Sequence, residues 1–235
     1  MRFLRLLRPL LAAVTLISAA AGAFAVEPKN GVDYLTLDAA TRPEAGKKIE
    51  VIEFFMYQCP HCNRLEPLIS DWVRKQGENI AFRRVHLAFS GPNDPQAHAY
   101  VTLDAMGKLD AVHQKIFNAI HVDHIRLSTD EALLDFVAKN GIDKKQYLEF
   151  FNSFAVQTKM KRGSQLTATY KIDSAPSIVV NGHYVTSPSM AGRPGQAENL
   201  SQIAALQVLD ALVLKSQKDN GVAAAGSAAV KTVKK

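Results

Sequence analysis

An apolar run from Val51 to Tyr57 leads directly into Cys59 and Cys62, the only two cysteines in a chain of 235 residues. The length of this run and its apolar character predict a strand that is buried on both faces. Apolar side chains at helical spacing follow the second cysteine: Leu65, Leu68, Ile69 and Trp72. The first cysteine is therefore expected where a buried strand ends and a helix begins.

That position favours the ionised form of Cys59. The first N–H groups of a helix have no partner within the helix, and the helix dipole is positive at this end, so a thiolate is stabilised over a thiol. A lower thiol pKa supplies more nucleophile at neutral pH and also makes a better leaving group. Cys62 lies one helical turn further on, within reach of Cys59. We interpret the two cysteines as a redox pair.

The first 25 residues have the pattern of a secretory signal. Residues 2–8 contain three arginines, Leu10–Ala21 is apolar, and Ala23-Phe24-Ala25 provides a small-x-small cleavage site. The apolar run is too short to span a bilayer comfortably, and no other stretch is long enough to do so. We expect cleavage after Ala25 and export to the periplasm, where oxidising conditions allow disulfides.

The chain after this signal has 210 residues (235 − 25), which suffices for one domain or for a domain with an insertion. Without the three arginines of the signal it has 25 basic side chains (28 − 3) against 22 acidic ones. Arginine-rich patches with interleaved aromatic residues, which are typical of nucleic-acid binding, do not appear in the sequence. Nucleic acid is therefore not expected as a partner.

Two segments with β-strands flank a helical one. A strand over Lys47–Tyr57, the helix that contains Cys62 and a strand over Ile80–Leu87 form a βαβ unit with parallel strands. Between Asp94 and Tyr170 the sequence predicts helices only. Strand pattern returns at Ser177–Val180, and an Asn181-Gly182 turn predicts a hairpin with residues 183–186.

A last amphipathic helix is expected over Gln196–Lys215. Residues 216–235 are rich in Ala, Gly, Ser and Lys, and this composition predicts a disordered tail.

Cys59-Pro60-His61-Cys62 at the strand–helix junction, with a distant Ala175-Pro176 before a strand, resembles the thioredoxin superfamily. With the helical segment and the signal, the chain is similar to the DsbA family of periplasmic disulfide oxidoreductases, of which C-P-H-C is typical. The resemblance covers about Tyr34 to Lys215. It implies an α/β thioredoxin-like fold in which residues 26–90 and 171–215 form one discontinuous domain. Residues 91–170 would be a helical domain inserted after the first βαβ unit.

The resemblance also implies roles within the motif. Cys59 would be the exposed thiol that transfers its disulfide to a substrate, and Cys62 the buried partner that resolves the mixed disulfide. Pro60 and His61 would tune the redox pair, with His61 stabilising the Cys59 thiolate. The resemblance to the DsbA family therefore also implies a depressed pKa of Cys59 and an oxidising potential of the pair.

Three further residues receive roles from the resemblance. Pro176 would form a cis peptide bond with Ala175 and face the cysteines, leaving the neighbouring backbone free to bind an extended substrate peptide. Glu53, inside the apolar strand, would be a buried carboxylate near Cys62 that accepts protons and has a raised pKa. Alternatively, Glu53 is an outward-facing strand residue. We favour burial, because the strand appears apolar on both faces.

The function implied is that of an oxidase which donates the Cys59–Cys62 disulfide to newly exported proteins. A membrane quinone reductase of the DsbB type would reoxidise it. The disulfide itself is the redox group, so no metal or other cofactor is expected, and we expect a monomer.

Other functions compete with this one. A disulfide isomerase or reductase of the same superfamily would use the same cysteines, although isomerases usually carry an added dimerisation domain. A metal-binding C-x-x-C module needs two more ligands, and His121 and His124 are the only other closely spaced histidines. A purely structural disulfide explains little, because closing so small a ring constrains the chain hardly at all.

Overall fold

A five-stranded mixed sheet organises the chain, in the strand order β1-β5-β4-β2-β3. The computed structural model describes residues 27–37 and 48–232, with side chains up to residue 220. The strands are β1 (Leu35–Thr36), β2 (Ile49–Phe55), β3 (Ile80–His86), β4 (Ser177–Val180) and β5 (Tyr184–Thr186). β2 and β3 are parallel, and the other neighbours are antiparallel. The predicted signal and its cleavage site after Ala25 lie outside the described residues.

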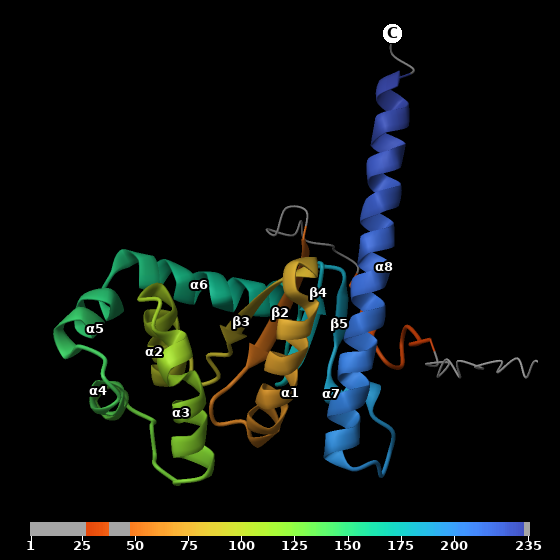
Figure 1. Ribbon diagram of the computed structural model, residues 1–235. Coiled ribbons are helices and arrows are strands. Elements are labelled where there is room, and N and C mark those ends of the chain that lie inside the picture. Colours follow the sequence, from red (N-terminus) through yellow and green to blue (C-terminus); the bar gives the residue numbers. More distant parts are fainter. Residues whose placement is uncertain (1–26, 38–47, 233–235) are drawn as a thin grey trace, which may run out of the picture.

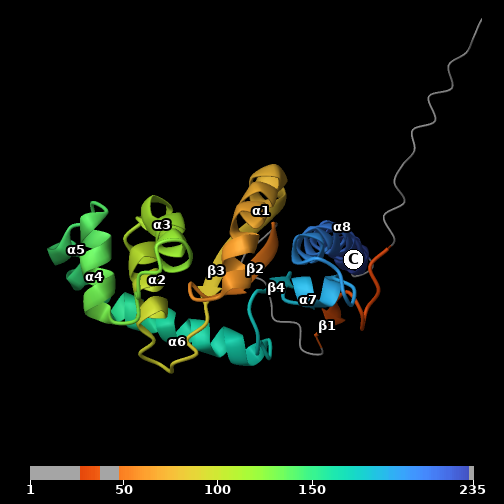
Figure 2. The same ribbon diagram turned by 90° about the horizontal axis from the view of Figure 1, so that it is seen from below.

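β2 is buried along its whole length, as the apolar run predicts. Val51 packs on one face of the sheet with side chains of α1 (Pro60–Gln76) and α8 (Glu198–Thr232). Ile52 and Phe54 point to the opposite face, where the end of α6 (Phe154–Thr169) covers them. Figure 2 shows α1 and α6 on opposite faces of the sheet. This arrangement fixes the end of β2 inside the protein, and the redox motif follows immediately.

The helical insertion predicted from the sequence lies between β3 and β4. It consists of α2 (Pro95–Ala105), α3 (Leu109–His121), α4 (Asp130–Lys139), α5 (Lys144–Phe151) and α6. Side chains before α2, α4, α5 and α6 accept a hydrogen bond from the first turn of each helix: Asp94, Thr129, Asp143 and Ser153. Such caps define where helices begin. Figure 1 shows α2 to α5 beyond the β3 edge of the sheet, with α6 leading back to it.

The chain returns to the sheet through β4 and the predicted hairpin. Asn181 and Gly182 between the strands have φ angles of 52° and 66°, the left-handed region that a type I′ turn requires. The short helix α7 (Pro188–Ala191) leads to α8.

The disordered tail predicted for residues 216–235 is wrong as far as the structure describes it, because α8 continues beyond Lys215 to Thr232. Alanine, which is frequent in this segment, is the strongest helix former, so helix propensity prevails over the lack of apolar side chains.

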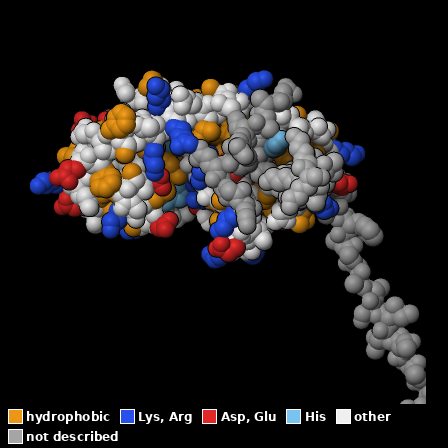
Figure 3. All heavy atoms as spheres, turned by 90° about the horizontal axis from the view of Figure 1, so that it is seen from above, with side chains coloured by type: hydrophobic (Ala, Val, Ile, Leu, Met, Phe, Trp, Pro, Cys, Tyr) orange, Lys and Arg blue, Asp and Glu red, His pale blue; other side chains and the backbone are white. Residues whose placement is uncertain are grey.

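The described helices do not include a bilayer-spanning one, and the face shown in Figure 3 is not strongly basic. None of the helices within residues 27–37 and 48–232 has the length and hydropathy needed to cross a membrane. Seen from above, lysine and arginine side chains are spread among acidic and apolar ones over the part of this face that the structure describes (Figure 3).

Candidate active site

Cys59 caps the N-terminus of α1. Its backbone is extended, with φ −77° and ψ 115°, and Pro60 occupies the first helical position, where its missing N–H costs nothing. The Cys59 Sγ accepts a hydrogen bond from the Cys62 backbone N–H at 3.3 Å. Both cysteines are free thiols, 6% exposed for Cys59 and 1% for Cys62. The exposed thiol expected at Cys59 is therefore largely covered, because Cys59 packs in the same apolar cluster as Cys62 and Ala175.

The two thiols have opposite electrostatic environments. Hydrogen bonding from the Cys62 thiol, followed by the backbone N–H groups of Cys62 and His61, lowers the pKa of Cys59 from 9.0 to about 6, although burial opposes this. The pKa of Cys62 is raised far above its usual range, first by its hydrogen bond to Cys59 and then by burial. A thiolate at Cys59 and a thiol at Cys62 are thus the favoured pair of states.

The predicted Ala175–Pro176 bond is cis and faces the redox pair. The Cys59 Sγ lies 3.4 Å from the Ala175 carbonyl oxygen, to which the thiol form of Cys59 donates, so residues 116 positions apart meet at the sulfur. A cavity of about 460 Å³ opens beside them. Its lining includes His61, Ala175, Pro176, Arg193 and Glu198. An extended peptide entering this cavity would reach the motif and the cis-proline loop together.

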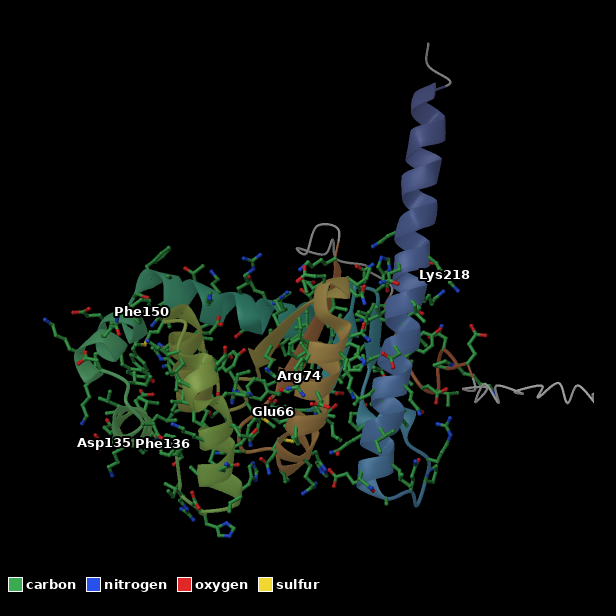
Figure 4. All side chains as sticks on the ribbon, in the orientation of Figure 1. Glu66, Arg74, Asp135, Phe136, Phe150 and Lys218 are labelled. Carbon is green, nitrogen blue, oxygen red and sulfur yellow. The ribbon has the colours of Figure 1, made fainter. Side chains whose placement is uncertain are left out.

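Glu53 is buried, 1% exposed, so the outward-facing alternative is wrong. Its partner is Arg84, directly opposite it in the β2–β3 register, whose Nε donates to Glu53 Oε2 at 2.8 Å. Arg84 also donates from Nη2 to both carboxylate oxygens of Glu66 at 2.9 Å. Figure 4 shows Glu66 on the side of α1 that faces the insertion. Two buried carboxylates therefore share one guanidinium.

One of these two carboxyl groups holds its proton near neutrality. Burial raises the pKa of Glu53 to about 7, in spite of Arg84 and with help from the charge of Glu66. Burial also opposes ionisation of Glu66, but His113, whose Nε2 lies 3.4 Å from Oε2, and the charge of Arg84 lower its pKa below the usual value. The carboxyl with the raised pKa is the one predicted from the sequence. It stands close enough to the cysteines for their charges to influence one another.

Three histidines hold Tyr57, two residues before Cys59. The Tyr57 N–H donates to His86 Nε2 at 3.1 Å, and its hydroxyl lies 2.8 Å from His113 Nδ1. His121 Nε2 donates to the Tyr57 carbonyl at 2.8 Å. Burial lowers the pKa of His86 to about 4, which agrees with an unprotonated Nε2 that accepts. Every polar group of Tyr57 thus has a histidine partner.

Sequence reasoning missed most of this network. No sequence motif includes Arg84, Glu66 or His113. The three histidines show no pattern in the sequence, because they lie 29, 56 and 64 positions from Tyr57. His121 and His124 were considered as a pair of metal ligands. His121 instead donates to the Tyr57 carbonyl, and His124 lies after the end of α3 with a left-handed φ of 55°. Within residues 27–37 and 48–220 no cluster of three or more histidine, cysteine or acidic residues is placed to hold a metal ion.

Residues 50–197 match the family model described as the DSBA-like thioredoxin domain. Together with the C-P-H-C pair at the start of α1 and the facing cis-proline, this match decides the family. The chain belongs to the DsbA family. It is a thiol:disulfide oxidoreductase with a thioredoxin-like fold and a helical insertion.

Individual DsbA proteins are similar over nearly the whole chain. The thiol:disulfide interchange protein DsbA of Burkholderia cepacia is 39% identical over 215 residues, which cover 91% of this chain and 97% of that protein. DsbA of Azotobacter vinelandii is 40% identical over 176 residues, covering 75% of this chain and 81% of that protein. The crystal structure of Pseudomonas aeruginosa DsbA superposes with a TM-score of 0.75 at 32% identity, covering 84% of this chain and 98% of that one.

Proposed function

We propose that the protein is a periplasmic thiol:disulfide oxidase that donates its Cys59–Cys62 disulfide to newly exported proteins. The observation that carries the proposal is the position of the Cys59 sulfur at the N-terminus of α1, where it accepts a hydrogen bond from the Cys62 N–H at 3.3 Å and where the pKa of the thiol is lowered to about 6. Stabilising the thiolate stabilises the reduced protein, and a pair whose reduced form is stabilised gives up its disulfide readily. The signal-like residues 1–25, with cleavage after Ala25, support export to the periplasm, where such a donor has substrates.

Disulfide transfer begins at the oxidised pair. A substrate thiolate attacks the Cys59 sulfur, the Cys59–Cys62 bond breaks, and Cys62 leaves as a thiolate that takes up a proton. Burial raises the pKa of the Cys62 thiol and so makes that protonation favourable, and the Glu53 carboxyl, with a pKa raised to about 7, is a nearby group able to supply the proton.

The second step releases the product. Another substrate thiolate attacks the substrate sulfur of the mixed disulfide, and Cys59 departs as a thiolate. The substrate loses two electrons and gains a disulfide, while the enzyme keeps a Cys59 thiolate and a Cys62 thiol. A low pKa makes Cys59 the better leaving group, so the mixed disulfide resolves toward oxidised substrate.

Binding and reoxidation follow from the same site. The cavity lined by Ala175, Pro176 and His61 would take an extended cysteine-containing segment of the substrate. The reduced enzyme must then pass its two electrons on, and a membrane quinone reductase of the DsbB type is the partner that family membership suggests. An isomerase or reductase would instead need a less oxidising pair, so the redox equilibrium separates these functions.

The equilibrium of the pair with reduced and oxidised glutathione tests the direction of transfer. Thiol alkylation of the purified protein should show a pair that stays reduced even in fairly oxidising glutathione buffers. Cys62→Ser, incubated with oxidised glutathione and a reduced substrate protein that has a single cysteine, should accumulate mixed disulfides on non-reducing gels, because neither Cys62 nor a second substrate thiol can displace Cys59. Cys59→Ser should accumulate none. A wild-type pair that oxidises as readily as thioredoxin would refute the oxidase assignment.

A further inference from the structure

From the contacts between α8 and the redox motif, we infer that Glu198 is a positioning residue for His61. Its carboxylate fixes the imidazole beside Cys59 and thereby increases the oxidising power of the pair. The inference rests on the proposed function and on the stabilisation of the Cys59 thiolate by His61 that the resemblance to the DsbA family implies. Glu198 lies 137 positions from His61, and its part in the site is visible only in the folded chain.

Both oxygens of the Glu198 carboxylate are engaged at the motif. Oε1 lies 2.7 Å from His61 Nδ1, and Oε2 accepts a hydrogen bond from Arg64 Nη2 at 2.7 Å. A carboxylate only accepts, so Nδ1 carries the hydrogen in this contact. Arg64 Nη2 also lies 3.2 Å from Nδ1, but two donors cannot satisfy one another, so Glu198 is the partner that orients the ring.

A second residue of α8 extends the same contact to the backbone. Gln202, one turn after Glu198 and 2% exposed, donates from Nε2 to the His61 carbonyl at 3.3 Å and to Glu198 Oε1 at 3.3 Å. The start of α8 therefore holds both the side chain and the main chain of His61. Arg64 also keeps Glu198 ionised, because its hydrogen bond lowers the pKa of that carboxyl.

Stability alone does not account for this arrangement. The side chains of His61 and Glu198 are 58% and 35% exposed, and exposed ion pairs contribute little to folding. The position does matter chemically, because the His61 backbone N–H and the charge of a protonated His61 both favour the Cys59 thiolate. Arg64 interacts with the same thiolate. Glu198 thus contacts both His61 and Arg64, the two side chains near Cys59 that interact with its thiolate.

The sign of the effect separates this role from a simple charge effect. A carboxylate acting directly on Cys59 would disfavour the thiolate, so its removal would lower the pKa of Cys59. A carboxylate acting through His61 has the opposite result, because its removal frees the imidazole and weakens its stabilisation of the thiolate. The two accounts therefore predict opposite shifts for the same substitution.

The test uses Glu198→Ala, Glu198→Gln, His61→Ser and the double variant His61→Ser/Glu198→Ala in the full chain. Thiolate absorbance against pH gives the pKa of Cys59, and the glutathione equilibrium gives the oxidising power. Glu198→Ala should raise the pKa of Cys59 and make the pair roughly fivefold less oxidising, in line with one exposed ion pair. Glu198→Gln, which keeps an acceptor for Nδ1, should lie between Glu198→Ala and wild type. The double variant should match His61→Ser.

Glu149→Ala, which removes an exposed carboxylate on α5, serves as the matched control and should leave both readouts unchanged. Circular dichroism and urea unfolding check that each variant is folded. An unchanged or lowered pKa of Cys59 in Glu198→Ala, or an undiminished effect of that substitution in the His61→Ser background, would overturn the inference. The proposed function stands or falls separately on the wild-type glutathione equilibrium, while the pKa comparison tests Glu198 whatever that equilibrium proves to be.

Discussion

Replacing Cys59 with alanine should change how the stability of the reduced protein depends on pH. In the folded protein the pKa of Cys59 is lowered from 9.0 to about 6, mainly by the Cys62 thiol and the neighbouring N–H groups. A depressed pKa contributes stability that is fully present above the unfolded value of 9.0. This contribution is lost as the pH falls through about 6, where the folded thiolate takes up its proton.

The size of this contribution follows from the two pKa values. Ionisation of Cys59 should stabilise the reduced protein by about 2.7 kcal/mol at pH 8, about 1.4 kcal/mol at pH 7 and about 0.1 kcal/mol at pH 5. The side chain is nearly covered, at 6% exposed, so screening by solvent reduces these figures little. The free energy of unfolding of reduced wild type, minus that of reduced Cys59→Ala, should therefore rise by roughly 2.5 kcal/mol between pH 5 and pH 8.

Urea unfolding of both proteins under reducing conditions, at several pH values between 5 and 8, measures this difference. Groups that titrate equally in both proteins, including most carboxyl groups, cancel in the comparison. Cys62→Ala removes the thiol that donates to Cys59, and that hydrogen bond is the largest cause of the low pKa of Cys59. In a Cys62→Ala background, the effect of Cys59→Ala on the free energy of unfolding should therefore depend less on pH. A difference that stays constant from pH 5 to pH 8 would show that Cys59 is not a stabilised thiolate.

Two predictions concern the buried carboxylates. Arg84→Met leaves Glu53 and Glu66 without their shared guanidinium, so it should lower the free energy of unfolding, measured with urea, by about 3–5 kcal/mol. The control is Arg74→Met, at an exposed position of α1 labelled in Figure 4, which should lower it by less than about 1 kcal/mol. Glu53→Gln should become more stable relative to wild type as the pH rises from 4.5 to about 7, with a change of up to about 3 kcal/mol in the difference between their free energies of unfolding. Both proteins are measured in the oxidised form, so that Cys59 does not titrate. The reason is that the raised pKa of Glu53 contributes stability to the wild type that is present below pH 4.5 and is lost as the pH rises from 4.5 to about 7. A difference that does not change over this pH interval would show that the pKa of Glu53 is not raised in the folded protein.

The parts of the site that depend on local sequence were predictable. The apolar run of β2 and the apolar spacing along α1 placed Cys59 at a strand–helix junction, and the structure confirms both of these. Asn181-Gly182 predicted the hairpin for the same reason, since the conformation of a turn is set by its own residues. The burial of Glu53 was also predictable, because its neighbours in the strand are apolar on both sides.

The partners of these residues were not predictable, because pairing across elements depends on register. A βαβ unit implies that β2 and β3 are adjacent, but it does not say that Glu53 lies opposite Arg84 and not one position away. Glu198 meets His61 only because α8 begins beside α1, which depends on the length of the loop after α7. The extent of α8 was missed for a different reason, since composition alone was taken to indicate disorder where helix propensity prevails.

The helical insertion belongs to the active site as well as to the fold. Two of the three histidines that hold Tyr57 come from α3, and His113 also lies 3.4 Å from Glu66 through its Nε2. Without α3, the Tyr57 hydroxyl and carbonyl would lose their partners, and each unpaired buried polar group costs about 1–3 kcal/mol. Of the polar groups of Tyr57, only the backbone N–H would then keep its histidine partner, His86. The insertion therefore fixes the approach to the redox pair, and packing changes in α3 reach the cysteines through Tyr57.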